Sequence, residues 1–107
     1  MDTDCVMVWT TIGSGADGHK LASALVSERL AACVNVLGEM DSVYRWKGQV
    51  EAERERQVIM KTTAELVPAL KARLLELHHY DLPEFIVIPI TAGSEQYLQW
   101  IRESAAG

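Results

Sequence analysis

The stretch of sequence that determines the fold runs from residue 41 to residue 62 and reads DSVYRWKGQVEAERERQVIMKT. Its first part alternates apolar and polar residues around Tyr44 and Trp46, which is typical of a β-strand. Gly48-Gln49 follows as a turn, and the second part passes from charged residues to an apolar run. We therefore predict a long β-hairpin with a bend near Gly38. A chain of 107 residues is too short to cover both arms, and exposed strand edges are usually paired, so the hairpin also predicts self-association.

The segments on either side of the hairpin complete the fold. Short apolar runs predict strands over residues 5–11, 31–37 and 84–90, the last with Pro89 at a sheet edge. Apolar residues at helical spacing predict helices between His19 and Ala32, from Glu65 to Leu77 with Pro68 in the first turn, and after Ser94. The order β-α-β-β-α-β plus a terminal helix predicts one α+β domain over residues 1–107, a ferredoxin-like sandwich. Its two crossover helices would cover one face of an antiparallel sheet and leave the other face apolar.

Charge and composition limit the classes of partner and compartment. The net charge is −5 with no basic stripe, so we expect neither nucleic acid nor a membrane surface as a partner. No apolar run reaches the length of a membrane span, and the acidic start of the chain does not resemble a signal peptide. Two cysteines, Cys5 and Cys33, do not make a disulfide framework. We therefore expect a cytoplasmic protein with reduced thiols.

The sequence contains no catalytic motif in which a nucleophile and a base can be paired, so we expect no enzymatic activity. The glycines at positions 13, 15 and 18 have the spacing of a dinucleotide-binding loop and lie between a predicted strand and a predicted helix. The acidic residue that such a site needs at the end of a second parallel strand is missing. A flexible connection between strand and helix is therefore the favoured interpretation of these glycines.

His78 and His79 lie at the end of the second predicted helix, where two interpretations stay open. An imidazole there can satisfy free carbonyl groups and interact favourably with the helix dipole. Alternatively, the pair contributes to a site for a divalent ion such as Cu(II) or Zn(II). A complete site would need further ligands from Cys5, Cys33 or another subunit.

Three more side chains stand out in the hairpin. Tyr44 and Trp46 are predicted to be neighbours on one strand face, in a core or an interface. Lys61 lies in an apolar strand, so its ammonium group must reach solvent, pair with an acid such as Glu84, or face a cleft.

Five motifs occur in an order that resembles a known family. They are Leu30-Ala31-Ala32-Cys33-Val34-Asn35, residues 42–48, Met60-Lys61-Thr62, residues 78–84 and Tyr97-Leu98-Gln99-Trp100. Together they resemble the CutA family of divalent-cation tolerance proteins, from about Val6 to Ile101. The resemblance implies a ferredoxin-like protomer in a homotrimer whose architecture is similar to that of the PII signalling proteins. It also implies a role in the response to metal ions, with copper binding in some members.

The resemblance also implies candidate site residues. The metal ligands expected for Cu or Zn are His78, His79, which replaces the proline of the family motif, and Cys33. One copper-site pattern of the family has a cysteine where this chain has Thr10. The residues expected to line a cleft between subunits are Tyr44, Trp46, Lys61, Tyr80, Glu84, Tyr97 and Trp100.

Three functions are compatible with these observations. The first is a homotrimeric divalent-cation tolerance protein that binds metal. The second is a PII-like module that holds an anionic or polar small molecule in clefts between subunits. The third is a structural trimer that supports a partner protein.

Overall fold

The computed structural model describes residues 3–106 of the chain. Its elements, in order, are β1 (Cys5–Gly13), α1 (Gly18–Ser27), β2 (Cys33–Trp46), β3 (Gln49–Thr63), a 3-10 turn η1 (Ala64–Leu66), α2 (Val67–Leu77), β4 (Ile86–Pro89) and α3 (Glu95–Ser104). None of the helices within residues 3–106 has the length and apolar character that a membrane crossing requires.

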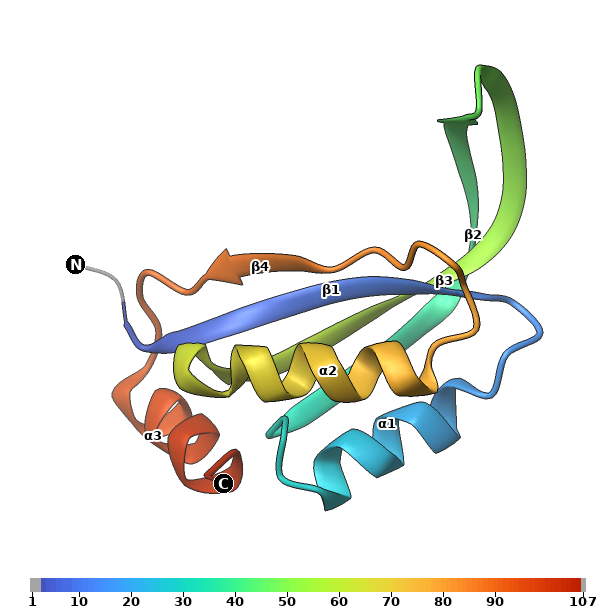
Figure 1. The fold of residues 1–107 in the computed structure, drawn as a ribbon. Helices are drawn as coiled ribbons and strands as arrows, with labels where there is room; N and C mark the ends of the chain where they lie inside the picture. The colour runs from blue at the N-terminus through green and yellow to red at the C-terminus, as the bar shows by residue number, and fades with distance from the viewer. Residues whose placement is uncertain (1–2, 107) are drawn as a thin grey trace.

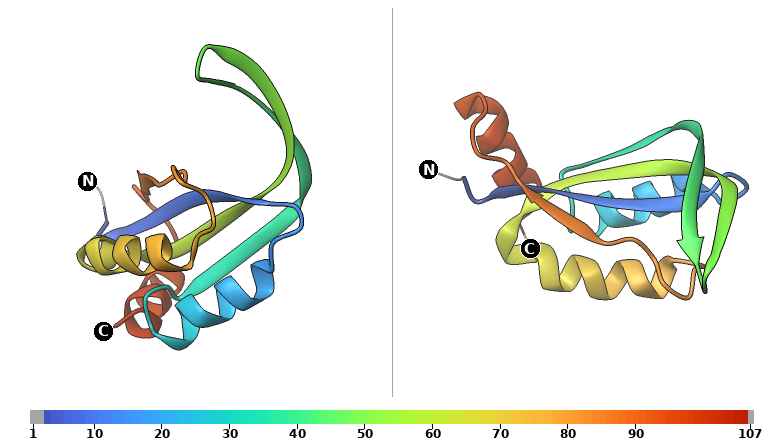
Figure 2. Two further views of the ribbon diagram at one scale, coloured as in Figure 1. Left: turned by 45° about the vertical axis from the view of Figure 1, so that its right-hand side comes forward. Right: turned by 90° about the horizontal axis from the view of Figure 1, so that it is seen from above.

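The four strands form one antiparallel sheet in the order β2-β3-β1-β4. Helices α1 and α2 lie side by side under one face of this sheet, whereas α3 packs at the end where β1 begins (Figures 1 and 2). This is the predicted ferredoxin-like α+β arrangement with an additional terminal helix. Because the sheet contains no parallel pair, it cannot form the dinucleotide site that the three glycines superficially suggest.

The core lies between the sheet and helices α1 and α2. Along β1 the residues at even positions are buried, and those at odd positions from Met7 to Gly13 are only partly covered. This alternation is expected when one sheet face packs against helices. The buried set joins β1 and β3 to both helices and comprises Val6, Val8, Ile12, Leu21, Leu25, Ala31, Val58, Met60, Leu70 and Leu74. A second cluster around Cys5, Leu98 and Ile101 holds α3 in place.

Within residues 3–106, no helix lies over the centre of the opposite face of the sheet, and we call this face the open face. Cross-strand pairing aligns Trp9 with Ile59 and with Ile86, and Met7 with Ile88. Residues paired directly across neighbouring strands share a face. Trp9 is half-buried, and its indole Nε1 is shielded from solvent with no hydrogen-bond partner within the described residues. The predicted apolar face is therefore present and uncovered in the protomer.

The outer part of the β2–β3 hairpin extends beyond β1 and β4 and rises away from the rest of the sheet (Figure 1). The pairing shifts by one residue between Val36 and Glu39, so a bulge stands at the predicted bend near Gly38. The turn consists of Lys47 and Gly48, both with positive φ, and not of Gly48 and Gln49 as predicted. Two successive residues of positive φ match the twist of a two-residue hairpin, which explains the displacement of the turn by one residue.

Three further boundaries differ from the prediction. Helix α1 ends at Ser27, before the predicted Ala32, because Arg29 adopts a left-handed conformation with a φ of 61°. The second predicted helix begins as the 3-10 turn η1, and α2 starts at Val67, with Pro68 in its first turn as expected. Strand β4 is limited to four residues and is therefore shorter than the strand predicted over residues 84–90, whereas its place at the sheet edge agrees with the prediction for Pro89.

Adjacent leucines on α2 provide a test of where the core lies. Leu74 is fully buried, whereas Leu75 is 48% exposed. We expect Leu74→Ala to lower the free energy of unfolding by about 2–5 kcal/mol, because it leaves a cavity in the core. Leu75→Ala is the matched control and should change it by less than about 0.5 kcal/mol. Chemical denaturation followed by circular dichroism measures both, and similar losses for the two variants would contradict this description of the core.

Candidate functional site

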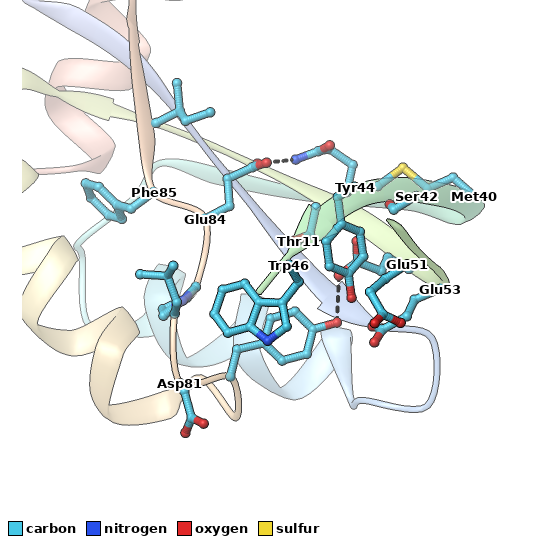
Figure 3. A pocket seen from close by; sticks show the side chains of 16 residues that line it. Thr11, Met40, Ser42, Tyr44, Trp46, Glu51, Glu53, Asp81, Glu84 and Phe85 are labelled. Atoms are coloured by element: carbon cyan, nitrogen blue, oxygen red, sulfur yellow. Dashed lines mark hydrogen bonds between the residues drawn. The ribbon is translucent and has the colours of Figure 1, made fainter. Parts of the chain in front are cut away.

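A groove of about 980 Å³ lies between the inner side of the hairpin and the segment that leads into β4 (Figure 3). We call it the hairpin groove. The hairpin contributes polar, aromatic and acidic side chains, and the opposite wall is formed by residues 80–86. The lining residues are Thr11, Met40, Ser42, Tyr44, Trp46, Glu51, Glu53, Glu55, Gln57, Tyr80, Asp81, Leu82, Pro83, Glu84, Phe85 and Ile86.

The bulge in β2 determines which hairpin side chains face the groove. Beyond it, Tyr44 pairs with Glu51, and Ser42 pairs with Glu53. Side chains alternate between faces along a strand, so one extra residue turns the even-numbered residues of outer β2 toward the face that the odd-numbered residues of β3 occupy. Tyr44 and Trp46 consequently face the same groove as the glutamates, as Figure 3 shows.

Two hydrogen bonds tie the walls of the groove together. The Tyr80 hydroxyl donates to Glu55 Oε2 at 2.6 Å, and Gln57 Nε2 donates to Glu84 Oε2 at 2.9 Å. Gln57 Nε2 is held in place by a further hydrogen bond to the Thr10 carbonyl at 2.8 Å. Glu55 is 7% exposed, so its carboxylate depends on this phenol for solvation. Burial and the adjacent Glu55 raise the pKa of Tyr80 well above its ordinary value, and the phenol is neutral at physiological pH.

The groove is strongly acidic. Five of its lining residues carry carboxylates, and none is a lysine, arginine or histidine. The ion pairs formed within residues 3–106 lie elsewhere: Arg54 with Glu39 and Asp41, Arg73 with Glu28 and Glu76, and Arg102 with Asp4. The groove carboxylates therefore have no cationic partner among the described residues.

His78, His79 and Tyr80 form an aromatic cluster beside the end of β1. His78 Nδ1 accepts the backbone N–H of Tyr80 at 3.0 Å, so Nε2 carries the proton and donates to the Thr11 carbonyl at 2.6 Å. Burial lowers the pKa of His78, which favours this neutral form. The His79 ring stacks on His78 at 5.0 Å, and a Cβ at Gly13 would stand 3.3 Å from His79 Nε2. A glycine at position 13 thus leaves room for the cluster.

The side chains of one protomer do not make a metal site. Among the described residues, no three histidine, cysteine, aspartate or glutamate side chains are grouped closely enough to hold an ion. Both nitrogens of His78 are already hydrogen-bonded, and its ring lies within 13° of parallel to His79, so the two imidazoles do not converge on one point. The residues present therefore do not fit a complete copper or zinc centre within one protomer.

Neither Cys33 nor Thr10 lies beside the histidines: Cys33 is far along the sheet, and the Thr10 side chain is on the opposite face. Cys33 pairs with Lys61, whereas Thr11, which binds His78, pairs with Gln57 four residues further along β3. Four residues span about 13 Å of strand. The Thr10 side chain is fully buried on the helix side of the sheet, and its Oγ1 has no hydrogen-bond partner within residues 3–106. No thiol of the same protomer reaches the histidine pair.

The residues predicted for one cleft separate into two groups in the protomer. Tyr44, Trp46, Tyr80 and Glu84 line the hairpin groove. Lys61, Tyr97 and Trp100 lie together elsewhere: Lys61 Nζ is 3.5 Å from the Tyr97 hydroxyl, and the rings of Tyr97 and Trp100 are 5.3 Å apart. Lys61 consequently does not pair with Glu84, which Gln57 binds instead.

Sequence reasoning found Glu84 but missed the other four acidic residues of the groove, which are Glu51, Glu53, Glu55 and Asp81. From the sequence alone, the charge-dense residues 51–56 are most simply interpreted as a solvated arm of the hairpin. The alternation of glutamate at positions 51, 53 and 55 was the available signal, because residues two apart on a strand share a face. To place these glutamates on the same face as Tyr44 and Trp46, one must also know the register of the hairpin, and a one-residue bulge changes that register.

Comparison with known proteins identifies the family. The family model described as CutA1 divalent ion tolerance protein matches residues 6–104. This chain belongs to the CutA1 family. The family is characterised by ion tolerance and not by a catalysed reaction, in agreement with the expectation that the chain is not an enzyme.

Relatives from distant organisms support this membership. The divalent-cation tolerance protein CutA of Thermus thermophilus is 43% identical over 98 residues, which cover 92% of this chain and 95% of that protein. The chloroplastic protein CutA of Arabidopsis thaliana is 41% identical over 99 residues, and this chain spans 54% of its length. The crystal structure of CutA from Xylella fastidiosa superposes with a TM-score of 0.91 at 38% identity, covering 96% of this chain and 99% of that one. The predicted family and fold are confirmed.

Because of the hydrogen bond between Tyr80 and Glu55, the free energy of unfolding should fall as the pH rises into the alkaline range. The folded pKa of Tyr80 is raised above the unfolded value of about 10, so its contribution is present in full below that pH and is lost as the pH rises toward the folded pKa. At neutral pH, Tyr80→Phe should lower the free energy of unfolding by about 1–3 kcal/mol, because the buried carboxylate loses its donor.

The variant should also lose less stability than the wild type between pH 9 and pH 11, as measured by urea denaturation across pH. Tyr97→Phe is the control, since the hydroxyl of the exposed Tyr97 makes a long contact of 3.5 Å to Lys61 Nζ and does not bind a buried carboxylate. Parallel pH profiles for wild type and Tyr80→Phe would show that the phenol does not stabilise the fold in this way.

Proposed function

We propose that the chain is a homotrimeric divalent-cation tolerance protein of the cytoplasm and that it binds Cu(II) or Zn(II) through His79 and groups of a partner protomer. Family membership carries the tolerance function, since both the family model and the relatives are named for it. The open face of the sheet is the observation that supports assembly.

The open face has the character of a surface that a second copy covers. Trp9, Ile59 and Ile86 align across three of its four strands, and Ile86 is 50% exposed in the protomer. Burying apolar area contributes about 25 cal/mol per Å², so these side chains favour association. Trp9 Nε1 also favours association, because it is a buried donor without an acceptor among the described residues. Such a donor is destabilising, and a neighbouring chain can supply the acceptor.

The histidine pair supports metal binding only when further ligands are added. His79 is exposed and stacks on His78, and neutral imidazole is a common ligand of Cu(II) and Zn(II). Because the protomer provides no third ligand nearby, the site we propose is completed by a partner protomer. Cys33 can contribute to it only from that partner chain.

Assembly through the open face is tested by Ile59→Glu. Wild-type protein should sediment as three chains of 11.9 kDa each, and the variant should dissociate, because desolvating an ionised carboxylate at an interface costs several kcal/mol. Val26→Glu, on the exposed side of α1, is the control and should leave the trimer intact. Sedimentation equilibrium gives the masses, and a wild-type monomer or a trimeric Ile59→Glu variant would contradict the proposal.

Metal binding is tested by calorimetry with Cu(II) on three histidine variants. His79→Ala should weaken binding by about tenfold or more, since losing one ligand or its outer support has this effect in metal sites. His19→Ala, in the exposed first turn of α1, is the control and should bind as the wild type does. His78→Ala and Cys33→Ser then show whether these residues take part. Equal affinity in the wild type and His79→Ala would overturn the histidine assignment.

A second candidate function is a PII-like module that holds a small molecule, and the hairpin groove is the observation that favours it. The sequence suggests an anionic or polar ligand, and the five carboxylates of the groove disfavour the anionic alternative because they repel negative charge. A small ligand of this groove has to be neutral or cationic.

A further inference from the structure

The hairpin groove has two walls of different chemistry, and this difference points to a particular ligand. The hairpin wall carries the carboxylates of Glu51, Glu53 and Glu55 with the aromatic rings of Tyr44 and Trp46. The facing wall is largely apolar and includes Leu82, Pro83, Phe85 and Ile86. A complementary ligand carries positive charge on one side and hydrocarbon on the other.

The spacing of the carboxylates favours an elongated cation over a metal ion. Glu51, Glu53 and Glu55 alternate along β3, so their Cα atoms are about 6.6 Å apart in turn, at about 3.3 Å per residue. A metal ion needs oxygens that converge on one point, and the described residues contain no such group of three. A row of separated carboxylates instead matches a chain of ammonium groups joined by short alkyl segments.

The aromatic side chains add a second reason for an ammonium ligand. The Lys47 ammonium stands 5.9 Å from the centroid of the Trp46 ring, so this ring already accepts a cation in the protomer. Trp46 is 42% exposed and lines the groove together with Tyr44 and Tyr80. The hydroxyl of Tyr80 donates its hydrogen bond to Glu55, and the Tyr80 ring forms part of the groove wall.

We propose that the hairpin groove binds a linear aliphatic polyamine, with ammonium groups beside Glu51 and Glu53 and methylene segments against residues 82–85. The groove carboxylates have no cationic partner among the described residues, so the ligand neutralises charge that the chain leaves uncompensated. This inference goes beyond the metal-related function proposed above and does not depend on the histidine pair.

The experiment is a calorimetric titration of the purified oligomer with spermidine, compared with Mg²⁺ at equal ionic strength. We expect spermidine to bind and Mg²⁺ to bind much more weakly. The variant Glu51→Gln/Glu53→Gln should bind spermidine about tenfold more weakly, the result of losing two exposed charge pairs. Trp46→Leu should also weaken binding, because it removes the ring and keeps an apolar side chain.

The matched control is Glu65→Gln/Glu95→Gln, which removes the same charge from exposed sites outside the groove. It should bind spermidine as the wild type does. Circular dichroism confirms that each variant is folded before titration. The proposal is overturned if the wild-type oligomer gives no spermidine signal, if both double variants lose affinity equally, or if Mg²⁺ binds as well as spermidine.

Discussion

The structure depends on a sheet that is covered by helices on one face only. Helices α1 and α2 pack against the even-numbered side chains of β1 and β3, and this contact forms the main core. The described residues contain no further helix that covers the centre of the other face, since α3 packs at one end through Leu98 and Ile101. The same alternation that builds the core therefore leaves Trp9 and Ile59 without a cover. The core of the protomer and the apolar face proposed for association come from one pattern of residues.

The hairpin groove continues the open face and differs from it in charge. Gln57 and Thr11 connect the two regions, because both lie on the open face and both line the groove. Toward β4 the face is apolar and suits another protein chain. Toward the hairpin tip it is lined by carboxylates and aromatic rings, and burying these carboxylates against an apolar partner would be costly. One continuous surface thus divides into an apolar part, where we propose assembly, and an acidic part, where we propose a cation.

Much of the fold could be predicted from periodicity, but the site could not. The alternation around Tyr44 and Trp46, the helical spacing and the order of elements were sufficient for the ferredoxin-like topology. Boundaries were missed where local backbone conformation decides them, as at Arg29 and at the turn of Lys47 and Gly48. The predicted cleft separated into two groups because Lys61 and Gln57 occupy different registers of β3. Which carboxylates share a groove with Trp46 depends on one extra residue in β2, and no composition or spacing rule specifies it.

The bulge also affects which length changes the outer hairpin can accept during evolution. Inserting or deleting one residue in either arm beyond Gly38 would exchange the two faces of that arm from the change to the turn. A change in β3 would turn Arg54 toward the groove in place of Glu53. A change in β2 would turn the acids that Arg54 binds toward the groove in place of Trp46. Changes of two residues in each arm preserve both faces and alter only the reach of the hairpin. Length variation among hairpins that keep this groove should therefore occur in matched, even steps.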